Sequence, residues 1–205
     1  QGATVVRFEL AGYEELAANV ANDAYEAGAA FDAYLAGVAR GAQAAPAHPT
    51  GASLPIDSFG ALVASRTAHP FVQSALEAEA IIGGPDHPTS LDRIRNREKL
   101  RILVAARMAD LGLDAILYPL QKILPVAAGE REQPERNGVL SHGTGFPAVT
   151  FPGGFSEPTE RAPLGVPVGA ELLGLDYTEP KLLAYAYAYE QVARVRKPPV
   201  STPAL

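Results

Sequence analysis

The 205-residue chain contains no cysteine. Disulfide bonds, metal sites built from thiolates and a cysteine nucleophile are therefore excluded for these residues. The composition is otherwise that of a folded globular protein, because 47% of the residues are hydrophobic and only 20% are charged.

Positive charge is also scarce. The chain has 17 Lys and Arg residues against 23 Asp and Glu residues, which gives a formal net charge of -6. A nucleic-acid partner is not expected, because phosphate binding needs a concentrated positive surface. One modest basic cluster, Arg194, Arg196 and Lys197, follows a predicted helix. We interpret it as a solvated helix end whose cations suit the helix dipole.

Long apolar runs are missing as well. No run approaches the roughly 20 residues that a membrane-spanning helix needs, and no basic segment leads into an apolar one near the first residue. We therefore expect a cytoplasmic protein without a membrane partner. Because the chain starts at Gln1 and a strand-like run at residues 3–10 follows almost at once, we expect it to be a piece of something longer.

Residues 1–112 are predicted to be mainly helical after an initial strand at residues 3–10. Apolar residues at three- and four-residue steps predict one long helix over residues 13–40, bent near Gly28. A short helix is expected at residues 57–68.

Two further helices complete this first part of the chain. One begins at Pro70 and is stopped by Gly83. The other covers residues 91–111, with Thr89 or Ser90 as its cap and Gly112 at its end. The histidines near prolines lack the spacing of metal ligands and are interpreted as loop or helix-end residues: His48, His69 and His87.

Residues 113–205 are predicted to be rich in strands and pocket segments, and to finish with a helix. The expected strands are residues 114–119, 148–151 and 168–173, and the final helix runs from Thr178 to about Arg194. Alternating helices and strands indicate a single α/β domain over residues 1–205, with a mixed sheet flanked by helices.

Familiar catalytic motifs are mostly absent. A dinucleotide-type glycine spacing begins at Gly143, but it precedes a strand and contains Pro147, so we interpret these glycines as a tight turn. Neither a Gly-x-Ser-x-Gly elbow nor a Ser-x-x-Lys spacing occurs. Ser141 and His142 adjoin, but a nucleophile and its base normally come from separate segments.

The stretch QPERNG at residues 133–138 is the most suggestive polar segment. It gathers a carboxylate, a guanidinium and two amides just before a predicted buried strand, where ligands often bind. A surface loop with an Asn-Gly turn explains the same residues. The residues alone favour the surface loop.

Four segments occur in the order found in the carboxyl-terminal half of amidase signature hydrolases, and the chain resembles that family through them. They are DAILYP at residues 114–119, TGFPAVTFPGGF at 144–155, GVPVGAELLG at 165–174 and LLAYAYAYEQ at 182–191. The resemblance is dense from about Asp114 onward and looser over the earlier helices. It implies that the chain forms part of the family's α/β/α fold.

The family hydrolyses carboxamides, or transfers ammonia from them, with a serine nucleophile, a second serine in a cis peptide and a lysine. The resemblance implies no metal and no organic cofactor. The family's Gly/Ser-rich signature and its lysine lie upstream of the matched segments, and nothing in this sequence corresponds to them. It follows that the chain carries no catalytic residue and is inactive alone. Its missing partner would be an amino-terminal catalytic half, and the substrate of the full-length parent a small-molecule amide.

In such enzymes the loop before residue 144 helps to build substrate selectivity. The resemblance therefore favours a pocket role for the polar stretch and for an amide shortly after Pro119. The implied substrate-binding residues are Gln121, Gln133, Arg136 and Asn137.

Two alternatives stay open. The chain could be a natural truncated protein that acts as a binding or assembly module and covers its exposed sheet edge as a homo-oligomer. It could also be an independent enzyme that uses Ser141 and His142.

Overall fold

The computed structural model describes residues 2–44, 56–127, 129–130, 133, 137 and 139–198. Its contacts divide the chain into two compact units, one made of Gln1–Ala18 with Arg97–Leu205 and the other of Asn19–Asn96. We refer to them as the sheet unit and the helical unit. The predicted single domain over residues 1–205 stays a prediction, because one domain can contain two such units.

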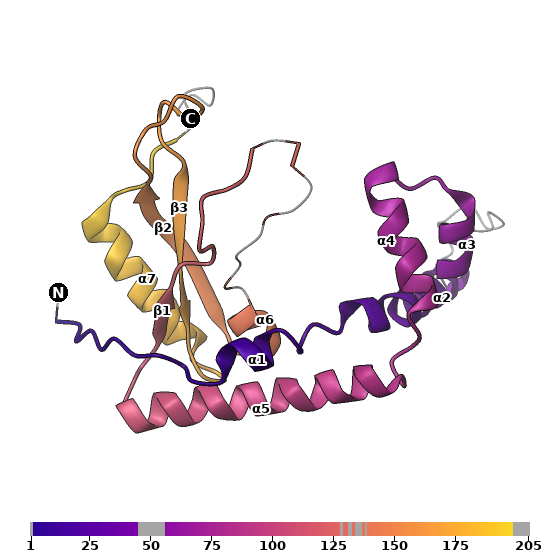
Figure 1. The fold of residues 1–205 in the computed structure, drawn as a ribbon, viewed down its shortest axis with the longest axis horizontal. Helices are drawn as coiled ribbons and strands as arrows, with labels where there is room; N and C mark the ends of the chain where they lie inside the picture. The colour runs from indigo at the N-terminus through magenta and orange to yellow at the C-terminus, as the bar shows by residue number, and fades with distance from the viewer. Residues whose placement is uncertain are drawn as a thin grey trace. The chain divides into compact units, whose positions relative to one another are not determined.

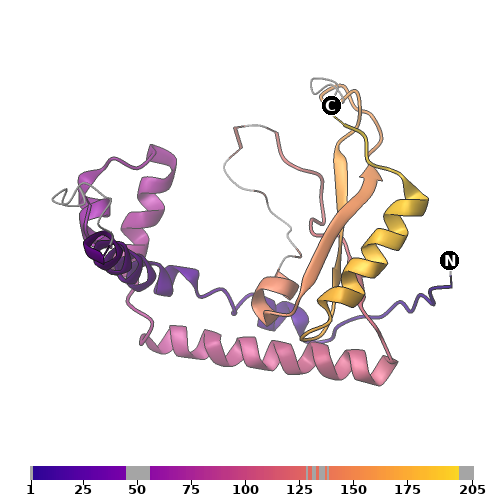
Figure 2. The same cartoon turned by 180° about the vertical axis from the view of Figure 1, so that it is seen from behind.

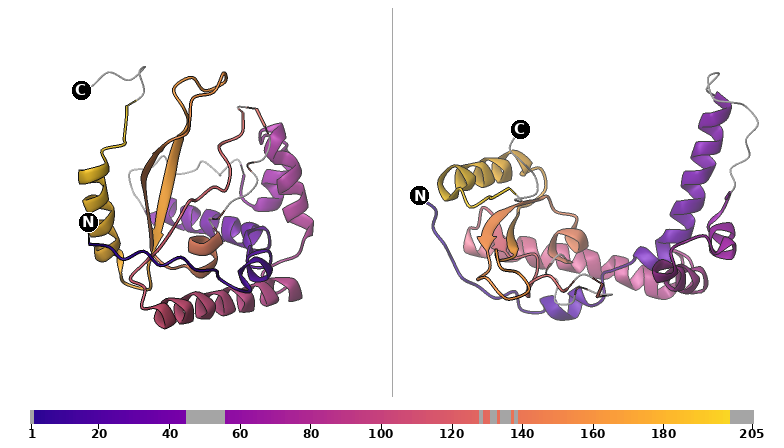
Figure 3. Two further views of the ribbon diagram at one scale, coloured as in Figure 1. Left: turned by 60° about the vertical axis from the view of Figure 1, so that its left-hand side comes forward. Right: turned by 90° about the horizontal axis from the view of Figure 1, so that it is seen from above.

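The helical unit gathers α2 (Asp23–Ala44), α3 (Phe59–Ser65) and α4 (Pro70–Ile81), as Figure 3 shows, together with the first residues of α5 (Pro88–Leu111). The helices predicted at residues 57–68 and from Pro70 are thus confirmed. Gly28 allows close packing of α2 on α3, because a Cβ there would lie 3.3 Å from Cδ1 of Phe59.

The long helix predicted over residues 13–40 is wrong, because the chain forms two helices there. The first, α1 (Tyr13–Ala17), belongs to the sheet unit, and α2 begins only at Asp23. The break falls before α2 rather than at Gly28. Asn22 explains its position: the side chain is buried and donates to Oε1 of Glu26 at 2.7 Å and to Oγ of Ser90 at 3.0 Å. An Asn held in this way offers the backbone an alternative to the helical path.

Histidines stand at two helix starts. Nδ1 of His69 accepts from the backbone N–H of Phe71, and Nδ1 of His87 from that of Thr89, both at 3.2 Å. The helix-end interpretation is confirmed for these two, whereas His48 lies outside the described residues. The cap predicted at Thr89 or Ser90 is wrong, because α5 already begins at Pro88, a residue suited to a first helical turn.

The sheet unit is built on a three-stranded sheet of β1 (Ile116–Tyr118), β2 (Ala148–Phe155) and β3 (Pro167–Leu173), in the order β1-β3-β2. An α/β fold is therefore confirmed. Both pairings are antiparallel, so within the described residues the mixed sheet is a wrong prediction. For β2 and β3 the reason is that no other described helix or strand lies between them in sequence, so the chain returns directly along its neighbour.

The predicted strand at residues 3–10 is also wrong, because the structure has no strand over residues 2–10. A strand-like composition supplies no partner edge, and an unpaired segment gains no ladder hydrogen bonds. By contrast β2 is longer than predicted and continues through Pro152, which lies opposite Gly169. Proline is tolerated there because β2 is an outer strand of the described sheet, and a bulge between Pro152 and Gly154 follows.

Helices cover the sheet and complete the core of this unit. In Figures 1 and 2, α7 (Glu179–Ala193) lies alongside β2, where Tyr189 and Phe151 have ring centroids 4.9 Å apart. Met108, Val104 and Leu100 form a buried stripe at four-residue steps on α5. The positive φ of 63° at Gly112 ends α5 as predicted. None of the described helices is both long and apolar enough to cross a membrane.

One short helix had not been expected. The loop expected before residue 144 ends in a helix, because Val139–Thr144 forms α6 just before β2. It is too short to show an apolar periodicity in the sequence. This helix closes the long connection between β1 and β2.

Candidate functional site

A buried carboxylate marks the centre of the sheet. Glu171 lies on the middle strand β3, opposite Tyr118 on β1, and only 4% of its surface is exposed. The hydroxyl of Tyr118 donates a hydrogen bond to Oε1 of Glu171. A buried charged group is costly without such a partner, so the pair forms one unit.

The surroundings keep Tyr118 protonated. Burial is the main cause that raises the pKa of the Tyr118 phenol above its ordinary value of 10.0, and the hydrogen bond and charge of Glu171 raise it further. A hydrogen bond with Ser141, on α6, acts in the opposite direction. Tyr118 is therefore a neutral donor at physiological pH, at a point where β1, β3 and α6 meet.

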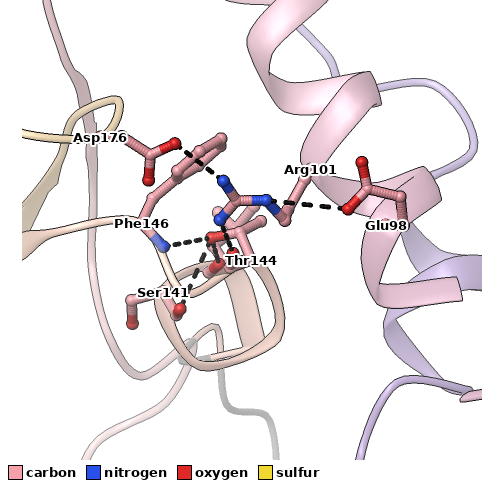
Figure 4. A network of polar contacts seen from close by, with 7 residues as sticks. Glu98, Arg101, Ser141, Thr144, Phe146 and Asp176 are labelled. Carbon is pink, nitrogen blue, oxygen red and sulfur yellow. Dashed lines mark hydrogen bonds and ion pairs between the residues drawn. The ribbon is translucent and has the colours of Figure 1, made fainter. Parts of the chain in front are cut away.

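A second polar network fixes the entrance to β2. Arg101 on α5 donates to the carbonyl of Thr144 and, at 2.8 Å, to Oδ2 of Asp176 (Figure 4). Its guanidinium carbon lies 4.4 Å from the ring centroid of Phe146. Glu98 adds an ion pair at 4.0 Å.

The network also accounts for the turn between α6 and β2. The hydroxyl of Thr144 donates to the carbonyl of Leu140 and accepts from the backbone N–H of Phe146 at 3.2 Å. Gly145 has a φ of 66°, a backbone conformation that favours glycine. One arginine thus ties α5 to the end of α6, the start of β2 and the segment before α7.

Asn137 fastens the long connection to the end of β1. Its backbone N–H donates to the carbonyl of Leu120 at 2.8 Å, and its Nδ2 donates to the carbonyl of Pro119 at 2.7 Å. The predicted residue therefore lies beside the segment that follows Tyr118. Its amide N–H groups hold backbone, which makes it a positioning group for that segment.

Gln133 forms hydrogen bonds within the same connection. Its Oε1 accepts from the N–H of Val126 at 2.8 Å, and its Nε2 donates to the carbonyl of Leu124 at 3.4 Å. Both bonds span fewer than ten residues, so the side chain shapes the fold of this connection itself.

Gln121 differs from these two amides. Its side chain is half-buried, and its Oε1 is a buried acceptor for which the described residues supply no donor. A buried, unsatisfied amide oxygen is a rare feature that calls for an explanation, such as a ligand N–H or a water. The fourth predicted residue, Arg136, lies outside the described residues. The structure thus brings Gln121 and Asn137 to the segment after β1.

The alternative pair Ser141 and His142 occupies consecutive positions of α6. Neighbouring side chains on a helix diverge by about 100°. Ser141 is half-buried beside the Tyr118 hydroxyl, whereas His142 is exposed. This geometry does not favour a nucleophile and base that act on one atom.

The sequence interpretation overlooked Glu171 as a site residue. One signal was available, because Glu171 is the single charged residue in the apolar run GVPVGAELLG. An acidic side chain on a buried strand is expected to have a polar partner. The described residues contain no group of three or more His, Cys, Asp or Glu side chains that could hold a metal ion.

Comparisons with known proteins cover only part of those proteins. No protein-family model matches the chain. It is 40% identical over 63 residues to a probable amidase of Arabidopsis thaliana, a match to 31% of the chain and 11% of the relative. It is 31% identical over 101 residues to one of the subunits of the glutamyl-tRNA(Gln) amidotransferase of Synechococcus, a match to 45% of the chain and 18% of the relative.

Solved structures match nearly the whole chain. The crystal structure of PAM12A superposes with a TM-score of 0.70 at 30% identity, over 97% of this chain and 38% of that one. The peptide amidase PAM, crystallised with the competitive inhibitor chymostatin, gives a TM-score of 0.65 at 28% identity, over 91% of this chain and 36% of that one. The chain spans less than two fifths of each solved protein and less than a fifth of each curated relative. Over the part that it spans, the chain is similar in sequence and in fold to amidases of the amidase signature family.

Proposed function

We propose that the chain is the carboxyl-terminal part of a cytoplasmic amidase that hydrolyses carboxamides at a non-peptide C–N bond. In this proposal a serine adds to the amide carbonyl, the C–N bond breaks and ammonia leaves with a proton. Water then splits the acyl ester to give the carboxylate. The two serines, one in a cis peptide, and the lysine belong to a part of the enzyme that this chain does not span. The chain alone is inactive and needs no cofactor.

One observation carries the proposal. The peptide amidase PAM matches 91% of the chain with a TM-score of 0.65, so the likeness extends over both compact units. The order of the four segments that resemble the family supports the same conclusion. Fold likeness alone is a weak basis for function, but here sequence identity of 28% accompanies it.

The chain's contribution in this proposal is to bind and orient the amide. Gln121 is the strongest candidate for direct contact, because its buried Oε1 can accept an N–H from a carboxamide. Asn137 and Gln133 hold the backbone around it. Arg136 is retained as a substrate-binding residue on the sequence argument. Together they form the proposed substrate-binding set.

Ammonia release is the direct test. The 205-residue chain and a longer protein that contains it should be compared on a C-terminally amidated dipeptide and on simple aliphatic and aromatic carboxamides. We expect release only from the longer protein. Ammonia production by the chain alone, unchanged in Ser141→Ala, would overturn the assignment of the catalytic residues. If the Ser141→Ala change abolished it, an independent enzyme would be favoured.

A second measurement separates binding from catalysis. In the longer protein, Gln121→Ala should lower kcat/KM about tenfold, because a lost hydrogen bond to an uncharged group is worth about 1 kcal/mol or somewhat more when buried. Gln191→Ala, at an exposed position of α7, is the matched control. Arg136→Ala with KM and kcat unchanged would remove Arg136 from the proposed set.

Self-association distinguishes the remaining alternative. A natural binding or assembly module should form one defined oligomer at all concentrations, because it must cover the outer strands of its sheet. Sedimentation of the 205-residue chain over a hundredfold range of concentration measures this. A single stable oligomer without amidase activity in any longer form would favour the module.

A further inference from the structure

The sheet unit has a pocket whose lining residues do not include Gln121, Gln133 or Asn137. It has a volume of about 360 Å³ and is formed by the ends of β2 and β3 nearest their connection, with residues 196–197 beyond α7. Its apolar walls include Phe151, Phe155 and Val168, and its cations are Arg196 and Lys197. The pocket lies within the lower part of the size range of small-molecule sites.

The walls of this pocket are held in place by the β2–β3 hairpin. Oγ of Ser156 accepts from the N–H of Val166, and the N–H of Ser156 donates to the carbonyl of Val166, both at 2.9 Å. A Cβ at Gly165 would lie 2.3 Å from the carbonyl oxygen of Ser156, so only glycine permits this close approach. The hairpin beside the pocket is therefore fixed before any ligand arrives, which lowers the entropic cost of binding.

The helix side of the pocket is fixed as well. Tyr189 on α7 packs on Phe151, and its hydroxyl donates to the carbonyl of Gly153 at 3.3 Å, next to the bulge in β2. A Cβ at Gly153 would lie 3.2 Å from the carbonyl oxygen of Val168. The bulge and Gly153 thus keep the apolar walls of the pocket in a defined shape.

The charge at the pocket has one sign. Arg196 and Lys197 line it, and no acidic side chain is among its lining residues. Nζ of Lys197 lies 5.3 Å above the centroid of the Phe155 ring, so this cation is already positioned over an apolar wall. Arg196 also lines a smaller neighbouring pocket of about 190 Å³ with Arg194 and Glu190. Cations gathered in this way favour an anion in a chain whose net charge is -6.

From this arrangement we propose that the pocket binds a small carboxylate with an apolar body, such as an arylalkanoate. The guanidinium of Arg196 and the ammonium of Lys197 would donate to the carboxylate, and the ring or alkyl part would contact Phe151 and Val168. The basic cluster after α7 thereby gains a role beyond that of a helix end. This site does not depend on the amidase proposal.

Binding can be measured by NMR titration of the 205-residue chain with 3-phenylpropionate. We expect saturable shifts in the amide signals of Gly154, Gly169 and Lys197, which border the pocket. The alcohol 3-phenylpropan-1-ol has the same apolar body without the charge, and should bind about tenfold more weakly because the charge-assisted hydrogen bonds are lost.

Charge variants locate the interaction. Arg196→Gln and Lys197→Gln should each weaken 3-phenylpropionate binding several-fold, and together about tenfold or more. Arg161→Gln removes the same charge from an exposed residue of the β2–β3 connection and is the matched control, with no change expected. Val168→Glu brings a like charge to the pocket wall and should abolish binding while circular dichroism stays unchanged.

Three results would overturn the proposal. The first is no saturable shift at millimolar 3-phenylpropionate. The second is equal affinity for the alcohol and the carboxylate, which would show an unselective apolar contact. The third is an affinity that is unchanged in the double variant or equally weakened by Arg161→Gln, which would show a general charge effect.

Discussion

The two compact units use hydrogen-bonded polar side chains in different ways. In the helical unit such groups hold helix starts: Asn22 bonds to Ser90 ahead of α2, and Oδ1 of Asp32 accepts from the N–H of Phe59 at 2.6 Å. In the sheet unit they connect strands and their connections, as Tyr118 does with Glu171 and Arg101 with Thr144. The comparison teaches that the helical unit is stabilised through its helix ends. The sheet unit is stabilised by bonds between neighbouring strands and by bonds that hold the segments leading into them.

The sheet unit should show the largest loss of stability. Leu173 is fully buried on the middle strand, so Leu173→Ala should lower the free energy of unfolding by about 3 kcal/mol through lost burial and a cavity. Leu117 is 61% exposed on the same sheet and is the matched control, with a cost of about 0.5 kcal/mol or less for Leu117→Ala. Urea unfolding measures the loss, and hydrogen exchange locates it. Equal acceleration of exchange in the helical unit would break the distinction between the units.

The hydrogen-bonded pair Tyr118 and Glu171 should give the next largest loss of stability in the sheet unit. Glu171→Gln and Tyr118→Phe should each cost about 1 to 3 kcal/mol, because each leaves a buried polar group with a weaker partner or none. A double-mutant cycle should show coupling between them. If the two costs simply add, the pair is not a unit.

The pH dependence follows from the same pair. Because the pKa of Tyr118 is raised in the folded state, its contribution to stability is complete below pH 10.0, the ordinary pKa of the phenol. It is lost as the pH rises further and the unfolded chain ionises first. Unfolding free energies measured from pH 8 to 11 should therefore fall above pH 10.0, and fall less in Tyr118→Phe. Identical slopes for the two proteins would contradict this assignment.

In the helical unit the expected effects are smaller. Asn22→Ala removes bonds to Glu26 and Ser90 and should cost about 1 to 2 kcal/mol. Hydrogen exchange should rise at the start of α2 and leave β3 unaffected. Exchange that rises equally in β3 would show that the two units unfold as one.

A helix cap gives the smallest effect. Oγ of Ser58 accepts from the N–H of Ala61 at 3.2 Å at the start of α3, so Ser58→Ala should cost about 1 kcal/mol. Ser65→Ala, at the other end of α3, removes a hydroxyl that donates to the carbonyl of Leu62 and should cost less. Thermal unfolding of the two variants gives the comparison, and the reverse order would refute the capping assignment.

Sequence patterns predicted the parts of the fold that depend on local preferences. Pro70 marks the start of α4, Gly112 the end of α5, and His69 a helix end, because each residue has a backbone or capping preference that acts within one turn. The prediction of a strand at residues 3–10 is wrong for the opposite reason, because a strand does not depend on local preferences alone. A strand is stabilised by a neighbour, and composition does not supply one.

For the candidate site the sequence indicated the region but not the function of each residue. It pointed to Gln121, Gln133 and Asn137, which lie in the connection between β1 and α6. The side chains of Gln133 and Asn137 form hydrogen bonds with backbone groups of this connection. Oε1 of Gln121 instead accepts no hydrogen bond from the described residues. The sequence could not distinguish these two cases. That distinction depends on which donors lie within hydrogen-bond reach in the folded chain.

By itself, the sequence determined the resemblance to the amidase signature family, the absence of thiol chemistry and the positions of most helices, because these follow from segment order, composition and short-range preferences. Only the tertiary structure decided that Glu171 meets Tyr118, that Arg101 holds the entrance to β2, and that Arg196 and Lys197 border an apolar pocket. Each of these contacts joins residues separated by tens of positions. Strand register and packing set such distances, and no local pattern encodes them.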